Sequence, residues 1–137
     1  MPVEMFAAYS HAIAALALWA VLVCVLSMLA AGARGAKKTC ACGKPAQDYT
    51  DPAYRRERAF MNAVEGAGPF VAVTVAAILI GASPFWVNLF ASAYLAARIA
   101  MAAVHIGTQN QPLRSVFFLI GLIAVLALAV LVLAAAF

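Results

Sequence analysis

Four long apolar stretches, separated by shorter polar segments, dominate the sequence. Each approaches or reaches the roughly 20 residues that a helix needs to cross the hydrocarbon core of a bilayer. The stretches cover about residues 6–31, 59–80, 85–106 and 116–137, with a polar loop at about 32–58. The pattern predicts an all-α membrane protein in which residues 1–137 form a single domain, a bundle of four transmembrane helices.

The composition agrees with a location in the membrane. Hydrophobic residues make up 67% of the 137 residues and charged residues only 10%, whereas an ordinary soluble domain is about 45–50% apolar. The first stretch could instead be a secretory signal peptide. Three features argue against a signal peptide. The residues before the stretch include Glu4 but no Lys or Arg, the apolar run is too long for a signal peptide, and Lys37 and Lys38 follow it. We therefore expect an integral, multi-pass membrane protein that keeps its first helix.

The basic residues predict the orientation, because cytoplasmic loops retain Lys and Arg. Seven of the nine lie between the first two stretches: Arg34, Lys37, Lys38, Lys44, Arg55, Arg56 and Arg58. The second connection, "GASPFWVN", has none, and the third, "GTQNQPLRS", has Arg114. We predict that the first and third loops face the cytoplasm and that both termini face the other side. The net charge of +4 then reflects topology, and nucleic acid is not an expected partner.

The three cysteines change this picture little. Cys40 and Cys42 lie in "KKTCACGKP", on the side predicted to be reducing, and Cys24 lies inside the first stretch. A zinc site needs more ligands than this pair offers, and neither His11 nor His105 is close in sequence. We interpret the pair as loop thiols rather than as a metal or redox motif, and we expect no metal site.

Polar side chains enter the second apolar stretch. In "RRERAFMNAVEGAGPF", a helix turning about 100° per residue places Arg55, Arg58, Asn62 and Glu65 within an arc of about 80°. Snorkelling to the interface explains arginines at a helix end. It does not explain Glu65, which lies roughly 10 Å deeper than Arg58. A carboxylate at that depth needs a partner or a water-filled cavity.

The third stretch supplies a partner for Glu65. Arg98 lies roughly 14 Å from the cytoplasmic end of its helix, a depth that matches Glu65 to within one turn. We predict a structural ion pair between Glu65 and Arg98 inside the bundle. His105 lies on nearly the same helical face as Arg98, where it is either an interfacial hydrogen-bonding residue or part of a site.

The fourth stretch adds Arg114 and Ser115 at its cytoplasmic end. One polar pocket inside the membrane, open to the cytoplasm, can then collect Arg55, Arg58, Asn62, Glu65, Arg98, Arg114 and Ser115. Such a pocket suits a small anionic ligand from the cytosol, next to lipid that can deliver an apolar one.

At these residues the sequence resembles the MAPEG superfamily, the membrane-associated proteins in eicosanoid and glutathione metabolism. It is most similar to the branch with microsomal prostaglandin E synthase and the microsomal glutathione transferases. The resemblance rests on the spacing of Arg55, Arg58, Ala59, Asn62, Glu65 and Pro69, followed in order by "GASPFWVN", Arg98 and "QPLRSVFF". These motifs cover about residues 55–118, and the four-helix layout extends the resemblance over the whole chain.

The resemblance implies a homotrimer whose sites lie between neighbouring subunits and open to the cytoplasm. Each site would bind glutathione and receive a lipophilic electrophile from the bilayer. The implied cofactor-binding residues are Arg55, Arg58, Asn62, Glu65 and His105. The implied catalytic residues are Arg114 and, beside it, Ser115, which would face the sulfur. A guanidinium stays protonated, so Arg114 would act by stabilising the thiolate, which then attacks an electrophilic carbon or a peroxide oxygen.

The chain departs from the family pattern at four positions. His105 and Phe118 stand where catalytic relatives have tyrosines, and Met61 and Asn110 stand where the prostaglandin branch has arginines. These changes remove hydroxyl donors and positive charge. They argue against prostaglandin synthesis and for weaker binding of glutathione.

Two function classes remain open. The first is a glutathione-dependent transferase or peroxidase in the membrane. The alternative is a non-enzymatic relative that binds lipid or assembles other membrane proteins; the missing tyrosines favour it, and the retained Arg58, Asn62, Glu65 and Arg114 oppose it. A channel or transporter subunit has only the intramembrane charges in its favour. A short chain with cytoplasmic thiols suits a bacterial inner membrane.

Overall fold

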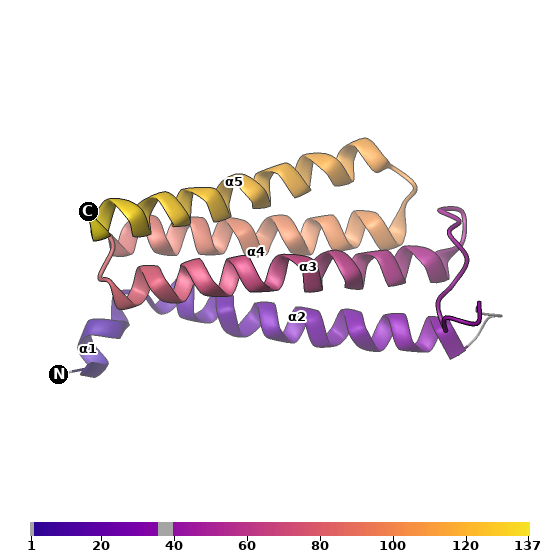
Figure 1. The fold of residues 1–137 in the computed structure, drawn as a ribbon, viewed down its shortest axis with the longest axis horizontal. Coiled ribbons are helices and arrows are strands. Elements are labelled where there is room, and N and C mark those ends of the chain that lie inside the picture. The colour runs from indigo at the N-terminus through magenta and orange to yellow at the C-terminus, as the bar shows by residue number, and fades with distance from the viewer. Residues whose placement is uncertain (1, 36–39) are drawn as a thin grey trace.

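The computed structural model describes residues 2–35 and 40–137. Its helices are α1 (Pro2–Ala7), α2 (Ser10–Gly35), α3 (Pro52–Leu79), α4 (Pro84–Gly107) and α5 (Gln111–Ala136). The last four are long and apolar enough to cross a membrane (Figure 1). The predicted all-α fold with four membrane-spanning helices is thus confirmed. Lys37 and Lys38, expected to follow the first span as a stop signal, lie outside the described residues.

Two helices begin earlier than the apolar pattern predicts, because polar caps extend them beyond the apolar stretch. α3 begins at Pro52 rather than about 59, where Asp51 Oδ1 accepts a hydrogen bond from the Ala53 amide at 2.9 Å. α5 begins at Gln111 rather than about 116, where Asn110 Oδ1 accepts one from the Leu113 amide at 3.0 Å. The expected loop at 32–58 is correspondingly shorter, and the arginines at 55, 56, 58 and 114 stand on helices.

The first predicted span is broken near its start, between α1 and α2. Asn88 of α4 faces the break: its Nδ2 donates to the Ala8 carbonyl at 2.7 Å, and its Oδ1 accepts from the Ala12 amide at 2.9 Å. The Tyr9 hydroxyl donates to the carbonyl of Ala82 at 2.5 Å. The Asn88 side chain thereby satisfies backbone groups that the interrupted helix leaves free, and Tyr9 joins the break to the α3–α4 turn.

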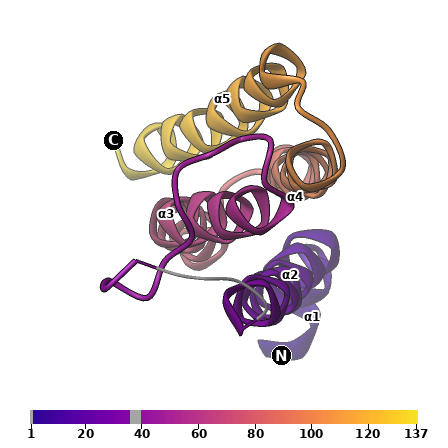
Figure 2. The ribbon, with the colours of Figure 1, turned by 90° about the vertical axis from the view of Figure 1, so that its right-hand side faces the viewer.

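α3 and α4 occupy the middle of the bundle, with α2 on one side and α5 on the other (Figure 2). The core lies between α2, α3 and α4, where Trp19 meets Tyr94 edge-on at 5.2 Å and Phe70 stacks on Tyr94 at 4.0 Å between ring centroids. α5 buries only Gly121, Ala124 and Leu128. Most of its apolar surface is therefore left for lipid or another protein.

The α2–α3 and α4–α5 loops lie at one end of the bundle, which we call the basic end, and both termini lie at the other (Figure 1). The α2–α3 loop runs over this end towards α4 and α5 before it enters α3 (Figure 2). That the basic end faces the cytoplasm stays a prediction from the charge distribution.

An ion pair fastens α2 to α3 at the basic end. Arg34 Nε and Nη2 lie 2.8 and 2.6 Å from Glu57 Oε2. The Glu57 side chain is only 4% exposed, and within the described part of the chain its Oε1 has no hydrogen-bond partner. The sequence pattern did not single out this carboxylate, which stands among arginines at the start of α3.

Replacing Arg34 with methionine should lower the free energy of unfolding by about 2 kcal/mol, because a nearly buried carboxylate loses its charged partner. Thermal unfolding of the detergent-solubilised protein measures this effect. Arg56→Met is the matched control, since it removes the same charge from a half-buried position outside the pair. Equal melting temperatures for the two variants would show that the pair contributes nothing.

Candidate functional site

Two adjoining cavities lie between α3, α4 and α5. The outer cavity, near the basic end, has a volume of about 230 Å³ and is lined by Arg58, Asn62, Met101, Arg114, Ser115 and Phe118. The inner cavity lies further along the same helices and has a volume of about 210 Å³; its polar lining is Asn62, Glu65, Tyr94 and Arg98. Asn62 and Phe118 line both cavities, so the two are neighbours along the bundle.

Most of the site residues predicted from sequence meet in these cavities. Arg58, Asn62, Glu65, Arg98, Arg114 and Ser115 come together from three helices. His105 lies beside them and is buried. Its Nδ1 is 3.5 Å from Asn62 Nδ2, and its Nε2 is 3.4 Å from Arg114 Nη1. The imidazole thus stands between the α3 and α5 sides of the outer cavity.

Tyr49, in the α2–α3 loop, is the main contact of Arg114. Arg114 Nη1 donates to the Tyr49 hydroxyl at 2.6 Å, and the guanidinium carbon lies 5.5 Å from the centre of the Tyr49 ring. The same ring stacks on His105, with centroids 6.0 Å apart. The loop therefore brings a phenol hydroxyl next to Arg114.

Arg55, one of the predicted cofactor-binding residues, is placed differently from Arg58 and Asn62, which line the outer cavity. Arg55 is buried, and its Nη1 donates to the carbonyls of Tyr49 and Thr50 at 2.8 and 3.0 Å. Its Nε donates to the carbonyl of Ile106 at 3.3 Å. Backbone carbonyls thus occupy the guanidinium, and Arg55 lines neither the outer nor the inner cavity. What Arg55 does is hold the loop, and with it Tyr49, against the end of α4.

The predicted contact between Glu65 and Arg98 is not formed. Among residues 2–35 and 40–137 no salt bridge joins them, although both line the inner cavity. The Arg98 guanidinium carbon lies about 5 Å from the ring centres of Tyr94 and Phe118, and Nη1 contacts Met101 Sδ at 3.7 Å. Glu65 is exposed at the surface of α3. The two residues match in depth, but depth does not fix the direction in which each side chain leaves its helix.

Two glycines let the helices approach closely around the inner cavity. A Cβ on Gly66 would lie 2.6 Å from the Tyr94 hydroxyl, which donates to the Gly66 carbonyl at 3.0 Å. A Cβ on Gly121 would lie 3.1 Å from Arg98 Nε. Tyr94 was absent from the sequence-based site, because its aromatic position on an apolar helix looks like an ordinary core residue.

Gly66→Ala should destabilise the protein by about 1–3 kcal/mol, because the new methyl group displaces the Tyr94 hydroxyl. Gly68→Ala is the matched control: apart from the adjacent residues and backbone of its own helix, nothing lies within 4 Å of its added Cβ, so only the gain in helix propensity remains. Thermal unfolding of both variants measures the difference. Adding Tyr94→Phe to Gly66→Ala should recover part of the loss, and no recovery would contradict the assigned clash.

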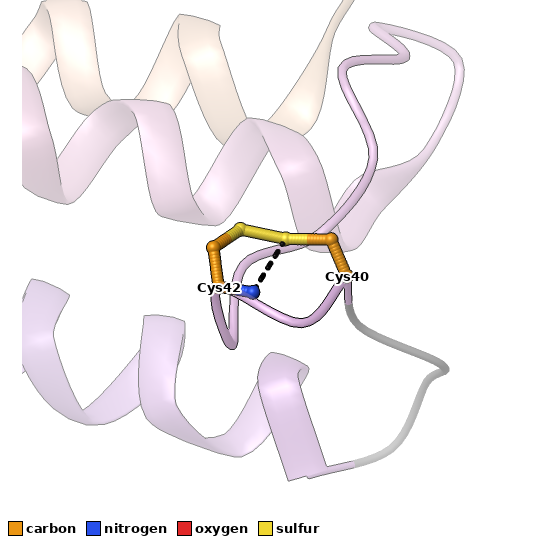
Figure 3. Close-up of a disulfide and its surroundings, with 2 residues drawn as sticks. All are labelled: Cys40 and Cys42. Carbon is orange, nitrogen blue, oxygen red and sulfur yellow. Dashed lines mark hydrogen bonds between the residues drawn. A yellow bond between two sulfur atoms is a disulfide. The ribbon is translucent and has the colours of Figure 1, made fainter.

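Cys40 and Cys42 are bonded as a disulfide (Figure 3). The interpretation of this pair as separate loop thiols is therefore wrong. A one-residue spacing is compatible with either state, and the sequence holds no signal that distinguishes them. Cys24 is a free, exposed cysteine on α2.

A comparison with protein families covers most of the chain. The model of a family described as the MAPEG family matches residues 12–134, a region that contains both cavities and every residue that lines them. No curated protein and no solved structure matches the chain.

Proposed function

We propose, from the premise that the chain belongs to the MAPEG family, that it is a membrane-embedded glutathione-dependent transferase or peroxidase. The family includes transferases and peroxidases that use glutathione. The observation that carries the proposal is the outer cavity, where Arg58 and Arg114 place two positive charges beside the hydrogen-bonding groups of Asn62 and Ser115. Glutathione has two carboxylates and a thiol, which are groups that such a lining can bind.

Arg114 acts on the thiol in this proposal. A guanidinium cannot accept a proton at physiological pH, so its contribution is electrostatic: it favours the thiolate over the thiol. Ser115 adds a hydroxyl in the same cavity wall. The thiolate then attacks an electrophilic carbon in a transferase reaction, or the oxygen of a hydroperoxide in a peroxidase reaction. The lipophilic second substrate reaches the site from the bilayer.

Tyr49 is a positioning residue for Arg114. The hydroxyl oxygen accepts the Arg114 hydrogen bond, and stacking on His105 holds the ring. Tyr49→Phe should therefore lower kcat/KM for thiol conjugation about tenfold, since a hydrogen bond to a charged group contributes about 1.5–3 kcal/mol. Steady-state kinetics measure this. Tyr54→Phe is the control, because it removes a hydroxyl that does not hydrogen-bond to Arg114. Equal values of kcat/KM for the two variants would show that Tyr49 does not position Arg114.

Membrane topology and assembly complete the proposal. Glu65 lies within a membrane-spanning segment and is exposed on the single chain, where lipid contact would be costly. Phe118, which lines both cavities, is 44% exposed. A second copy packed against this side would cover both residues and close the cavities. We propose a homotrimer with sites between neighbouring subunits, in a bacterial inner membrane with the basic end in the cytoplasm.

A panel of electrophiles and hydroperoxides, assayed with glutathione and the detergent-purified protein, tests the proposal. Turnover of any panel member that requires glutathione supports an enzyme. The competing function is a MAPEG-like subunit that binds lipid or assists membrane-protein assembly, which the absence of tyrosine at 105 and 118 favours. Saturable lipid binding without conversion of any panel member would decide for that function.

A further inference from the structure

A third cavity, which we call the loop cavity, lies at the basic end between the α2–α3 loop and the start of α3. Its volume is about 320 Å³. The Cys40–Cys42 disulfide forms part of its wall, together with Lys44 from the loop and Arg58 from α3. Arg58 also lines the outer cavity, so this arginine is common to the loop cavity and the proposed glutathione site.

The disulfide has little to contribute as a structural cross-link. It joins residues two apart in sequence, and the stabilisation from a cross-link grows with the length of chain that it closes. The turn has hydrogen bonds of its own: Gly43 N donates to the Cys40 carbonyl at 2.9 Å, and Cys40 N donates to the Lys44 carbonyl at 3.1 Å. Gly43 takes a φ of 74°, which glycine adopts without strain. The backbone turn therefore keeps the two sulfurs close together.

The two sulfurs differ in their surroundings. The Cys42 amide donates a hydrogen bond to Sγ of Cys40 at 3.2 Å (Figure 3). An N–H group directed at sulfur stabilises negative charge there, so Cys40 is the better leaving group when the bond breaks. Attack is then directed to Sγ of Cys42. Both cysteines are exposed, so a small molecule can reach them.

Charge and predicted location favour exchange at this bond. Lys44 and Arg58 line the loop cavity, and the carboxylate in its wall, Glu57, is paired with Arg34. The charge left for a ligand is therefore positive, which attracts an anionic thiolate. The charge pattern also predicts that the loop faces the cytoplasm. Cytosolic disulfides are usually transient and catalytic or redox-sensing. These features favour a Cys40–Cys42 disulfide that forms and breaks reversibly over a permanent structural disulfide.

We propose that Cys40 and Cys42 are a redox-active pair that exchanges with a small cytosolic thiol, RSH, bound in the loop cavity. In the first step RS⁻ attacks Sγ of Cys42, the Cys40–Cys42 bond breaks, and Cys40 leaves as a thiolate. In the second step another RS⁻ attacks the R sulfur of the mixed disulfide, which releases RSSR and leaves Cys42 as a thiolate. Two RSH are oxidised to RSSR, the protein disulfide is reduced, and the two protons pass to the cysteines. With excess RSSR the same steps run in reverse.

Alkylation of the full-length protein in glutathione redox buffers tests the pair directly. The parent is Cys24→Ser, so that intact mass counts only Cys40 and Cys42. We expect no alkylated thiols with excess oxidised glutathione, two per chain with excess reduced glutathione, and a single reversible transition between them. Peptide masses during reduction should place the mixed disulfide mainly on Cys42. Two alkylated thiols in every buffer, or none in any buffer, would overturn the proposal. Adducts mainly on Cys40 would overturn the assigned direction of attack.

The redox assay contains no electrophile, so its outcome is independent of the proposed conjugation reaction. Arg114→Ala should abolish conjugation and leave the alkylation transition where it is, because Arg114 does not line the loop cavity. Conversely, replacing both Cys40 and Cys42 with serine should remove the transition and leave conjugation. Lys44→Met should slow formation of the mixed disulfide severalfold. An unchanged rate would show that the charge of Lys44 does not attract the thiolate.

Discussion

Arg114→Ala is expected to lower kcat/KM for glutathione conjugation by at least about 100-fold, comparable to the loss of one essential donor at a site of developing charge. Arg114 projects into the outer cavity from the first turn of α5, and Tyr49 and His105 hold it in place. Its removal leaves no other fixed cation on α5. The variant should fold and assemble, because Arg114 is only half-buried and contributes nothing to the apolar core.

Two further variants separate charge from general disruption. Arg114→Lys keeps the positive charge but loses the planar guanidinium, so an intermediate rate is expected. Arg56→Ala removes an arginine from the start of α3, at the same end of the bundle, that lines none of the three cavities, and its rate should be unchanged. Light scattering checks the assembly of each variant. Wild-type activity in a correctly assembled Arg114→Ala protein would rule out the proposed mechanism.

Glu65→Gln is expected to raise the KM for glutathione about 30-fold with little change in kcat. Glu65 lines the inner cavity whereas Arg114 lines the outer one. Under the proposed function the carboxylate therefore binds the ammonium group of glutathione rather than its sulfur. Losing a charge-assisted hydrogen bond costs about 2 kcal/mol, which corresponds to roughly 30-fold in binding. A contact made equally before and during reaction changes KM and not kcat.

Glu65→Asp is the matched control, because it keeps the negative charge and should show a smaller rise in KM. Initial-rate kinetics at varied glutathione and saturating electrophile provide both constants. A fall in kcat as large as that in Arg114→Ala, or an unchanged KM, would contradict the role given to Glu65.

The spans and the polar helix positions could be predicted from sequence because each rests on a local, periodic property. Apolar length predicts where helices cross the membrane, and the spacing of Arg58, Asn62 and Glu65 puts them on one face of α3. The structure places all three on cavity walls, with Arg114 opposite. Helix starts were less accurate, because capping by Asp51 and Asn110 depends on single hydrogen bonds rather than on hydropathy.

The remaining site features depend on tertiary geometry that no periodicity encodes. Tyr49 reaches Arg114 from an irregular loop, and Arg55 turns towards carbonyls instead of the cavity. Arg98 is surrounded by aromatic rings rather than paired with Glu65, because equal depth on two helices leaves their rotation undetermined. The one available signal for Tyr49 was an aromatic residue in a polar loop that precedes the arginine-rich start of α3.

The ultraviolet absorbance of the glutathione thiolate, titrated into the detergent-purified protein near neutral pH, tests the central claim most directly. Wild type should show a saturable thiolate signal, and Arg114→Ala should bind glutathione without it. No saturable binding of millimolar glutathione to the wild-type protein, or an equal thiolate signal in Arg114→Ala, would contradict the assignment of the outer cavity as a thiol-activating site.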